Sequence, residues 1–238
     1  MSTASEKIII ALDVETLEQA RELVSCLNGT VGAFKIGKQL FTHCGPEAVA
    51  MVHAAGSRVF LDLKYHDIPT TVAKACAAAA DLGVWMVNMH ASGGTQMMSH
   101  AREELEKKSH RPLLVGVTIL TSMNEEDLRE MGHQCSVEEQ VMRLAQLVSD
   151  AGLDGVVCSA QEVKMLRNNL DKEFKLVTPG IRPAGSDNND QERVMTPGQA
   201  INAGSDYLVI GRPITQAADP VQVLKNIEEE ICAASMAV

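Results

Sequence analysis

Three charged residues lie within or just after a segment that otherwise predicts a buried β-strand. The segment Arg58–Tyr65 is mostly apolar, as in a strand of a parallel sheet, yet it contains Asp62 and Lys64. Side chains alternate along a strand, so residues two positions apart share a face. Asp67 follows the predicted strand end, and Pro69 stops further pairing. A carboxylate and an ammonium in such a segment must pair, because desolvating either ion alone is strongly unfavourable.

This pattern has a structural and a functional interpretation. An Asp-x-Lys pair alone is adequately explained as a salt bridge that ties the strand to its loop. Here a second acid, Asp67, accompanies the pair, and so does Lys35 from another predicted strand. We therefore interpret the four charges as part of a functional site.

The composition argues against several classes of partner. The chain has 238 residues, enough for one large α/β domain or two small ones, and its 45% hydrophobic content allows a sizeable core. A net charge of −10 makes nucleic acids and anionic membranes poor partners. An acidic protein that binds an anionic metabolite must concentrate its positive charge at the site. We therefore expect lysines and arginines to gather there.

The cysteines, histidines and apolar segments bear on compartment and metal content. The six cysteines form no C-x-x-C pair and fall mostly in apolar patterns, so we expect small core residues in a reducing compartment. The seven histidines lack zinc-ligand spacing, so we expect no metal site. The first residues enter an apolar strand too soon for a signal peptide, and no apolar stretch reaches transmembrane length. We expect a cytoplasmic location.

Short apolar segments alternate eight times with amphipathic helical patterns. The predicted strands are Ile8–Val14, Gly32–Gly37, Arg58–Tyr65, Trp85–Ala91, Leu113–Thr121, Gly155–Ala160, Lys175–Gly180 and Tyr207–Pro213. The predicted helices are Leu17–Leu27, Pro46–Ala55, Thr70–Leu82, Thr95–Lys107, Val137–Asp150, Gln161–Leu170, Pro197–Ala203 and Pro220–Ala233. The alternation predicts an α/β fold, a (β/α)8 TIM barrel, as a single domain over residues 1–238. A doubly wound open sheet is the alternative, but no G-x-G-x-x-G turn follows the first strand.

Polar and ionisable residues recur at the carboxyl ends of the predicted strands. They are Asp13, Lys35, Asp62, Lys64, Asn88, His90, Thr118, Thr121, Ser159, Thr178, Arg182 and Arg212. Each has a simpler explanation when taken alone; Thr121, for example, could cap the next helix. In a barrel, however, the reacting groups come from these ends of several strands. The whole set therefore predicts a site at this face.

The ends of the seventh and eighth predicted strands indicate a phosphate site. One turn contains Gly180 and Arg182, and the other contains Gly211 and Arg212. Glycine lets the backbone approach an oxyanion, and arginine can hold phosphate with two N–H donors. Barrels commonly bind phosphate at this position. The polar segment Ile181–Val194 follows the first turn and predicts a lid or binding loop.

Together these motifs resemble the orotidine 5′-monophosphate decarboxylase family over nearly the whole chain. The resemblance is carried by Ala11-Leu12-Asp13, Phe34-Lys35-Ile36-Gly37, Phe60-Leu61-Asp62-Leu63-Lys64-Tyr65-His66-Asp67-Ile68-Pro69, Leu120-Thr121-Ser122, Thr178-Pro179-Gly180-Ile181-Arg182-Pro183 and Val209-Ile210-Gly211-Arg212. It implies decarboxylation of orotidine 5′-monophosphate to uridine 5′-monophosphate, the last step of de novo pyrimidine synthesis. It also implies that the reaction needs no metal and no organic cofactor.

The resemblance implies catalytic roles for the charged residues. Lys64 would protonate C6 of the pyrimidine after carbon dioxide leaves, and Asp62 would lie beside the departing carboxylate. Lys35 and Asp67 would complete a row of alternating charges. Asp13 and Lys35 would contact the ribose hydroxyls.

It further implies a homodimer and a set of substrate contacts. Asp67 and Thr71 would reach into the site of the neighbouring subunit. The other implied contacts are Thr121 at the pyrimidine edge, Gln191 between base and phosphate, Arg182 at the root of the lid, and Gly211 with Arg212 at the phosphate.

Two other functions remain open. A magnesium-dependent keto-sugar-phosphate decarboxylase or hexulose-phosphate synthase of the same superfamily would share Asp62-x-Lys64-x-x-Asp67 but carry an acid at the position of Lys35. A catalytically silent barrel could bind a nucleotide as a sensor. The complete charge row argues against the sensor, because a carboxylate aimed at an anionic ligand weakens binding.

Overall fold

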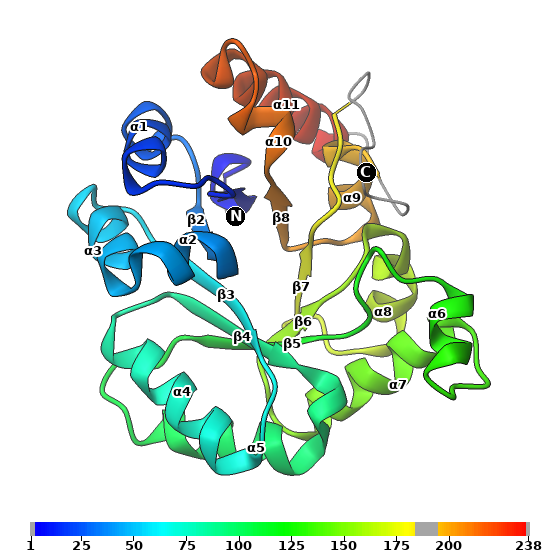
Figure 1. The fold of residues 1–238 in the computed structure, drawn as a ribbon. Helices are drawn as coiled ribbons and strands as arrows, with labels where there is room; N and C mark the ends of the chain where they lie inside the picture. Colours follow the sequence, from blue (N-terminus) through cyan, green and yellow to red (C-terminus); the bar gives the residue numbers. More distant parts are fainter. Residues whose placement is uncertain (1–2, 184–194, 237–238) are drawn as a thin grey trace.

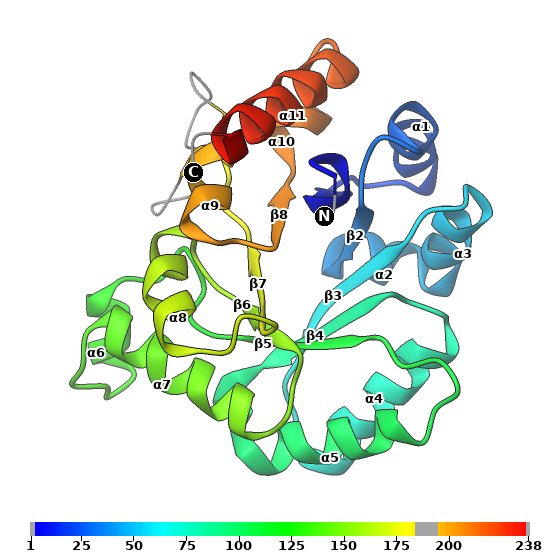
Figure 2. The same cartoon turned by 180° about the vertical axis from the view of Figure 1, so that it is seen from behind.

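The chain folds into a closed barrel of eight parallel strands with helices around it (Figures 1 and 2). The structure, a computed structural model, describes residues 3–183 and 195–236. Neighbouring strands pair in chain order, and β8 closes the barrel on β1. The strands are β1 (Ile8–Ala11), β2 (Ala33–Gly37), β3 (Val59–Tyr65), β4 (Met86–His90), β5 (Leu113–Val117), β6 (Gly155–Val157), β7 (Lys175–Thr178) and β8 (Tyr207–Ile210). The predicted (β/α)8 barrel is confirmed, and the open-sheet alternative is wrong.

Helices cover the outer surface of the barrel; α4 packs beside α5, and α9 packs beside α11 (Figures 1 and 2). The α-helices are α1 (Leu17–Leu27), α2 (Lys38–Cys44), α3 (Pro46–Ala54), α4 (Pro69–Asp81), α5 (Gly94–Glu106), α6 (Glu125–Glu130), α7 (Val137–Asp150), α8 (Val163–Asn169), α9 (Pro197–Ala203), α10 (Arg212–Thr215) and α11 (Pro220–Met236). Short 3-10 helices are η1 (Ser5–Lys7), η2 (Ala91–Gly93) and η3 (Ala160–Glu162). Within the described ranges, no helix combines the length and apolarity needed to cross a bilayer.

Local signals explain the helix starts that the sequence predicted correctly. The hydroxyl of Thr16 accepts a hydrogen bond from the Gln19 amide, which caps α1. Ser136 and Thr196 cap α7 and α9 in the same way, and the backbone N–H of each cap residue donates a reciprocal hydrogen bond to the side chain of the third helical residue. These caps fix the first residue of each helix, so the predicted bounds of α1, α7 and α9 are reproduced.

The alternation of side chains divides the core into two clusters. Outward-facing strand residues such as Ile8, Ile10 and Leu61 pack under the helices. Inward-facing residues fill the barrel with a separate apolar cluster: Ile9, Ala11, Ala33, Phe60, Met86, Val115, Val117, Val157, Val177 and Val209. Since this floor is apolar and almost completely buried, charged groups directly above it lie next to a medium of low polarity.

The inward positions become polar two residues farther along β2, β3 and β4. Ala33 is followed on the same face by Lys35, and Phe60 is followed by Asp62. On β4, Met86 is likewise followed on the same face by Asn88. The sheet thus supplies an apolar floor and a charged mouth.

Several predicted strands are too long, and three helices were not predicted. β1 ends at Ala11 and β5 ends at Val117, three and four residues before the predicted ends. β8 ends at Ile210, because Pro213 favours the first turn of a helix and α10 begins at Arg212. The other helices that were not predicted are α2 and α6. They are short, so they present too few turns for a periodic apolar pattern.

The expectation that the cysteines lie mainly in the core is only partly correct. All six are free thiols, but only Cys76 and Cys158 are buried. Cys26 and Cys232 are exposed. Cys26 lies on α1 between Val24 and Leu27, which are the residues that face the core. A cysteine within an apolar helical segment can therefore still lie on the solvent-exposed face of the helix.

Candidate active site

Asp13, Lys35, Asp62 and Lys64 form a continuous row of alternating charge at the carboxyl end of the strands. The Nζ of Lys35 lies 3.1 Å from Oδ1 of Asp13 and 3.3 Å from Oδ2 of Asp62. The Nζ of Lys64 lies 2.5 Å from Oδ1 of Asp62. Asp62 therefore holds both ammonium groups, one on each carboxylate oxygen. The prediction that Asp62 and Lys64 lie on one face and pair is confirmed.

The central pair of the row is buried and stays ionised. Lys35 is 8% exposed and Asp62 is 7% exposed. Burial would lower the pKa of the Lys35 ammonium, but the carboxylates of Asp62 and Asp13 raise it above its ordinary value. Burial would raise the pKa of Asp62, but Lys35 and Lys64, with hydrogen bonds from Lys64 and Asn88, lower it to about 2. Lys35 and Asp62 thus remain charged at neutral pH.

The backbone at Lys64 departs from a regular strand. Leu61 pairs with Val87 and Tyr65 pairs with Met89, so four steps along β3 match two steps along β4. The extra residues form a bulge. Within the described residues, Lys64 alone among non-glycines has a positive φ, at 52°. The bulge turns the Lys64 side chain back toward the mouth of the barrel.

Asn88, at the position on β4 that faces this bulge, holds both Lys64 and Asp62. Its Oδ1 accepts a hydrogen bond of 2.8 Å from the backbone N–H of Lys64. Its Nδ2 donates one of 2.6 Å to Oδ1 of Asp62. Asn88 is completely buried. The sequence placed it at a strand end but gave no indication of these bonds.

A cavity of about 270 Å³ opens beside the row. Phe60, Val117 and Val209 form part of its apolar floor, and the charge row forms one side. Gly180 and Gly211, from the turns after β7 and β8, also line it. The size and the mixture of an apolar floor with a few charged groups fit a small polar ligand that carries an apolar ring.

The positive charge predicted for the site is present at this cavity. Arg182 and Arg212 line it together with Lys35 and Lys64. Arg182 is buried, and its Nη1 donates a hydrogen bond of 3.0 Å to the Ile181 carbonyl. Arg212 is the first residue of α10. An acidic chain thus places four cations around one pocket.

Most of the predicted site residues line this cavity. They are Asp13, Lys35, Asp62, Lys64, Thr121, Arg182, Gly211 and Arg212. Asp67 and Thr71 do not line it and are exposed. Gln191 lies outside the described residues, as does most of the predicted lid segment Ile181–Val194.

Other residues of the cavity were not predicted as site residues. Ile119, Leu120 and Ser122 follow β5, and Cys158 follows β6. Cys158 had been interpreted as an ordinary core residue because its neighbours are apolar. A signal was available in its position directly after a strand, where barrels place their functional groups.

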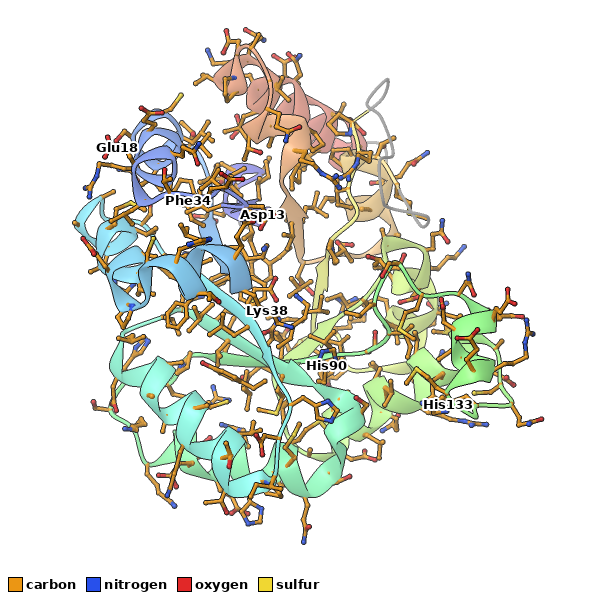
Figure 3. All side chains as sticks on the ribbon, in the orientation of Figure 1. Asp13, Glu18, Phe34, Lys38, His90 and His133 are labelled. Atoms are coloured by element: carbon orange, nitrogen blue, oxygen red, sulfur yellow. The ribbon has the colours of Figure 1, made fainter. Side chains whose placement is uncertain are left out.

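Two histidines lie beside the row. The rings of His66 and His90 are 5.6 Å apart between centroids. Burial, together with smaller contributions from His66, Lys38 and Lys64, lowers the pKa of His90 to about 4. In Figure 3, Lys38 and His90 lie near the centre of the view, whereas His133 lies at its periphery.

A closed parallel barrel with a charged cavity at the carboxyl ends of its strands is the architecture of a (β/α)8-barrel enzyme. The sequence model of the orotidine 5′-phosphate decarboxylase / HUMPS family matches residues 6–227. The chain belongs to this family.

Curated relatives and solved structures agree with this assignment. The orotidine 5′-phosphate decarboxylase of Saccharophagus degradans is 56% identical over 236 residues, which cover 99% of this chain and 99% of the relative. That of Vibrio campbellii is 58% identical, with coverage of 95% and 97%. The crystal structure of the Lactobacillus acidophilus orotidine 5′-phosphate decarboxylase superposes with a TM-score of 0.83 at 39% identity, covering 94% of this chain and 98% of that one.

Proposed function

We propose that this protein catalyses the decarboxylation of orotidine 5′-monophosphate to uridine 5′-monophosphate and carbon dioxide, the last step of de novo UMP synthesis. The reaction uses no cofactor, and Lys64 is the proton donor to C6. The observation that supports this most directly is the contact of Lys64 with buried Asp62 inside the cavity. Family membership and the full-length relatives support the same activity.

The reaction requires stabilisation of an electron pair. When the carboxyl group leaves as carbon dioxide, its bonding electrons remain on C6, and the ring offers no obvious electron sink. Fixed charges next to an apolar floor act on such a centre far more strongly than they would in water, and they need no reorganisation. The Lys64 ammonium is held by Asp62 at 2.5 Å. It stabilises the carbanion and then transfers its proton to C6.

Asp62 acts on the ground state. Its low pKa keeps it ionised, so it faces the substrate carboxylate as a like charge. This repulsion ends when neutral carbon dioxide departs. Lys35 balances the charge of Asp62 from the other side at 3.3 Å, and with Asp13 it binds the ribose hydroxyls.

Binding at the far end of the cavity holds the substrate in this unfavourable position. Arg212 and Gly211 bind the phosphate, and Arg182 supports the segment that follows β7. Gln191 bridges base and phosphate, and Thr121 contacts the pyrimidine edge. Phosphate binding provides the free energy that keeps the carboxylate beside Asp62.

The active form is a homodimer in which Asp67 and Thr71 complete the site of the partner subunit. Both side chains are exposed, which supports this because they are accessible to a partner subunit. We also propose that residues 1–238 form one catalytic domain and that the enzyme is cytoplasmic.

The magnesium-dependent keto-sugar-phosphate branch is the alternative within this family. Lys35 favours the decarboxylation of orotidylate, because its ammonium lies 3.3 Å from Oδ2 of Asp62. A cation of the protein therefore already occupies the carboxylate oxygen that a magnesium ion would need.

The test follows the absorbance of orotidine 5′-monophosphate with purified protein treated with EDTA. We expect turnover at the same rate with and without added magnesium. Protein with Lys64→Ala, purified in parallel, controls for contaminating activity. A strict requirement for magnesium, or turnover of keto-sugar phosphates instead of orotidylate, would favour the alternative branch.

A further inference from the structure

The neutral side chain of Asn88 forms hydrogen bonds with both the proposed proton donor and its carboxylate. It is completely buried on β4 and uses both ends of its amide. The carbonyl oxygen accepts from the backbone N–H of Lys64 at 2.8 Å. The amino group donates to Oδ1 of Asp62 at 2.6 Å.

The bond to Lys64 meets a specific need of the bulge. A lysine with φ of 52° is in the left-handed region, which side chains with a Cβ rarely adopt. The surrounding structure must hold such a residue in place. Asn88 lies between the register pairs Leu61–Val87 and Tyr65–Met89, so its side chain faces the distorted residues. In a regular strand pair, the backbone N–H of Lys64 would donate to a backbone carbonyl of the neighbouring strand. At the bulge the side-chain oxygen of Asn88 accepts that hydrogen bond instead.

The bond to Asp62 fixes the other half of the pair. Oδ1 of Asp62 accepts from both Asn88 and Lys64, and its Oδ2 faces Lys35. With these partners the carboxylate cannot rotate without losing a contact. The three residues therefore form one closed unit: backbone of Lys64 to Asn88, Asn88 to Asp62, and Asp62 to the ammonium of Lys64.

We propose that Asn88 is a positioning residue that sets the direction of the Lys64 ammonium by holding the left-handed backbone of that residue and the carboxylate of Asp62 at once. The inference rests on the proposed function, since it concerns the proton donor of that reaction. Asn88 is not expected to touch the substrate.

Two substitutions separate positioning from folding. Asn88→Leu keeps the size of the side chain and removes both hydrogen bonds. We expect kcat to fall on the order of 100-fold, as for a misplaced catalytic group. The dissociation constant of uridine 5′-monophosphate should change by less than about threefold, because the phosphate site at β7 and β8 is untouched.

Asn88→Asp provides a readout that a purely structural role would not change. When the new carboxyl is protonated, its carbonyl accepts from Lys64 and its hydroxyl donates to Asp62, as the amide does. When it is ionised, it repels Asp62. Burial and the neighbouring carboxylate raise its pKa. The kcat of this variant, relative to that of the wild type, should therefore rise as the pH is lowered from about 8 to about 5.

Asp154→Ala is the matched control. Asp154 also bridges two strands, accepting from the Leu114 N–H at 2.7 Å and from Arg111 at 2.7 Å, but it lies at the opposite end of the barrel. The Asp154→Ala substitution should lower the midpoint of thermal unfolding and leave kcat unchanged. Wild-type kcat in Asn88→Leu, or a wild-type pH profile in Asn88→Asp, would overturn the inference. An inactive wild type would instead refute the proposed function.

Discussion

Lys64 contacts Asp62 from within its own strand, with 2.5 Å between Nζ and Oδ1. In a regular strand, two residues separated by one position lie about 7 Å apart, and their side chains run parallel. Here the left-handed backbone at Lys64, with φ of 52°, turns the side chain toward its neighbour. The proposed proton donor is thus fixed by a local distortion and not by a partner on a mobile loop. Rigid support of this kind suits a group that must act without reorganisation.

Removal of the Lys64 ammonium should abolish turnover without unfolding the barrel. Lys64→Ala deletes both the positive charge next to C6 and the proton, so we expect kcat to fall by about 10⁴-fold or more. Uridine 5′-monophosphate should still bind, measured by calorimetry. Lys107→Ala, at an exposed site directly after the end of α5, is the control and should keep full activity. Retention of more than a small fraction of the rate would eliminate Lys64 as the proton donor.

Loss of Arg212 should discriminate between ligands with and without phosphate. Charge-assisted hydrogen bonds contribute about 1.5–3 kcal/mol, so Arg212→Ala should weaken the binding of orotidine 5′-monophosphate by roughly 10- to 100-fold. The nucleoside orotidine should be processed as by the wild type. Arg21→Ala, on the exposed face of α1, serves as the matched control. Equal loss for both substrates would place the phosphate elsewhere in the molecule.

The eight strands, the order of their charged ends and most of the cavity were predictable because they depend on local patterns. A buried parallel strand is a short apolar run, and its carboxyl end is the next polar residue along the chain. Asp13, Lys35 and Asp62 could be assigned to one face on that basis alone. In the structure Lys35 lies within salt-bridge distance of both Asp13 and Asp62.

The bulge in β3, which was not predicted, involves a contact between distant residues, whereas the missed helices lack a clear local pattern. The bulge in β3 has no sequence signal, because Val59–Tyr65 is equally compatible with a straight strand. At the bulge the backbone N–H of Lys64 donates to the side chain of Asn88 on β4, a contact between residues distant in the sequence. The start of α10 directly after β8 was missed because an apolar pattern does not mark where a strand gives way to a helix.

His90 should make the protein sensitive to mild acid. Burial lowers its pKa to about 4, whereas an unfolded histidine has a pKa near 6.5. Between these values the unfolded chain binds a proton that the folded chain does not, so the free energy of unfolding decreases as the pH falls through this window. Protonation of Asp62 affects the free energy of unfolding only below this pH window, because the ordinary pKa of the carboxyl is 3.8 and its pKa in the folded protein is about 2.

His90→Gln should therefore reduce the loss of stability between pH 6.5 and pH 4, measured by urea denaturation at a fixed protein concentration. His133→Gln, on the loop between α6 and α7 and far from the charge row (Figure 3), provides the comparison and should behave as the wild type. An identical pH dependence in wild type and His90→Gln would mean that another group is responsible for the acid sensitivity.

A mixture of two inactive variants should recover activity if each site is shared between subunits. In a dimer of one Asp67→Ala subunit and one Lys64→Ala subunit, one site contains both intact residues and the other contains neither. Random assortment gives half mixed dimers, so roughly a quarter of the wild-type activity should return after refolding the two together. Lys35→Ala mixed with Lys64→Ala is the control: both residues belong to the same subunit's site, so no site is repaired. Recovery in the first mixture but not in the control would mean that Asp67 belongs to the site of the other subunit. Inactivity of both mixtures would mean that each site is formed by a single subunit.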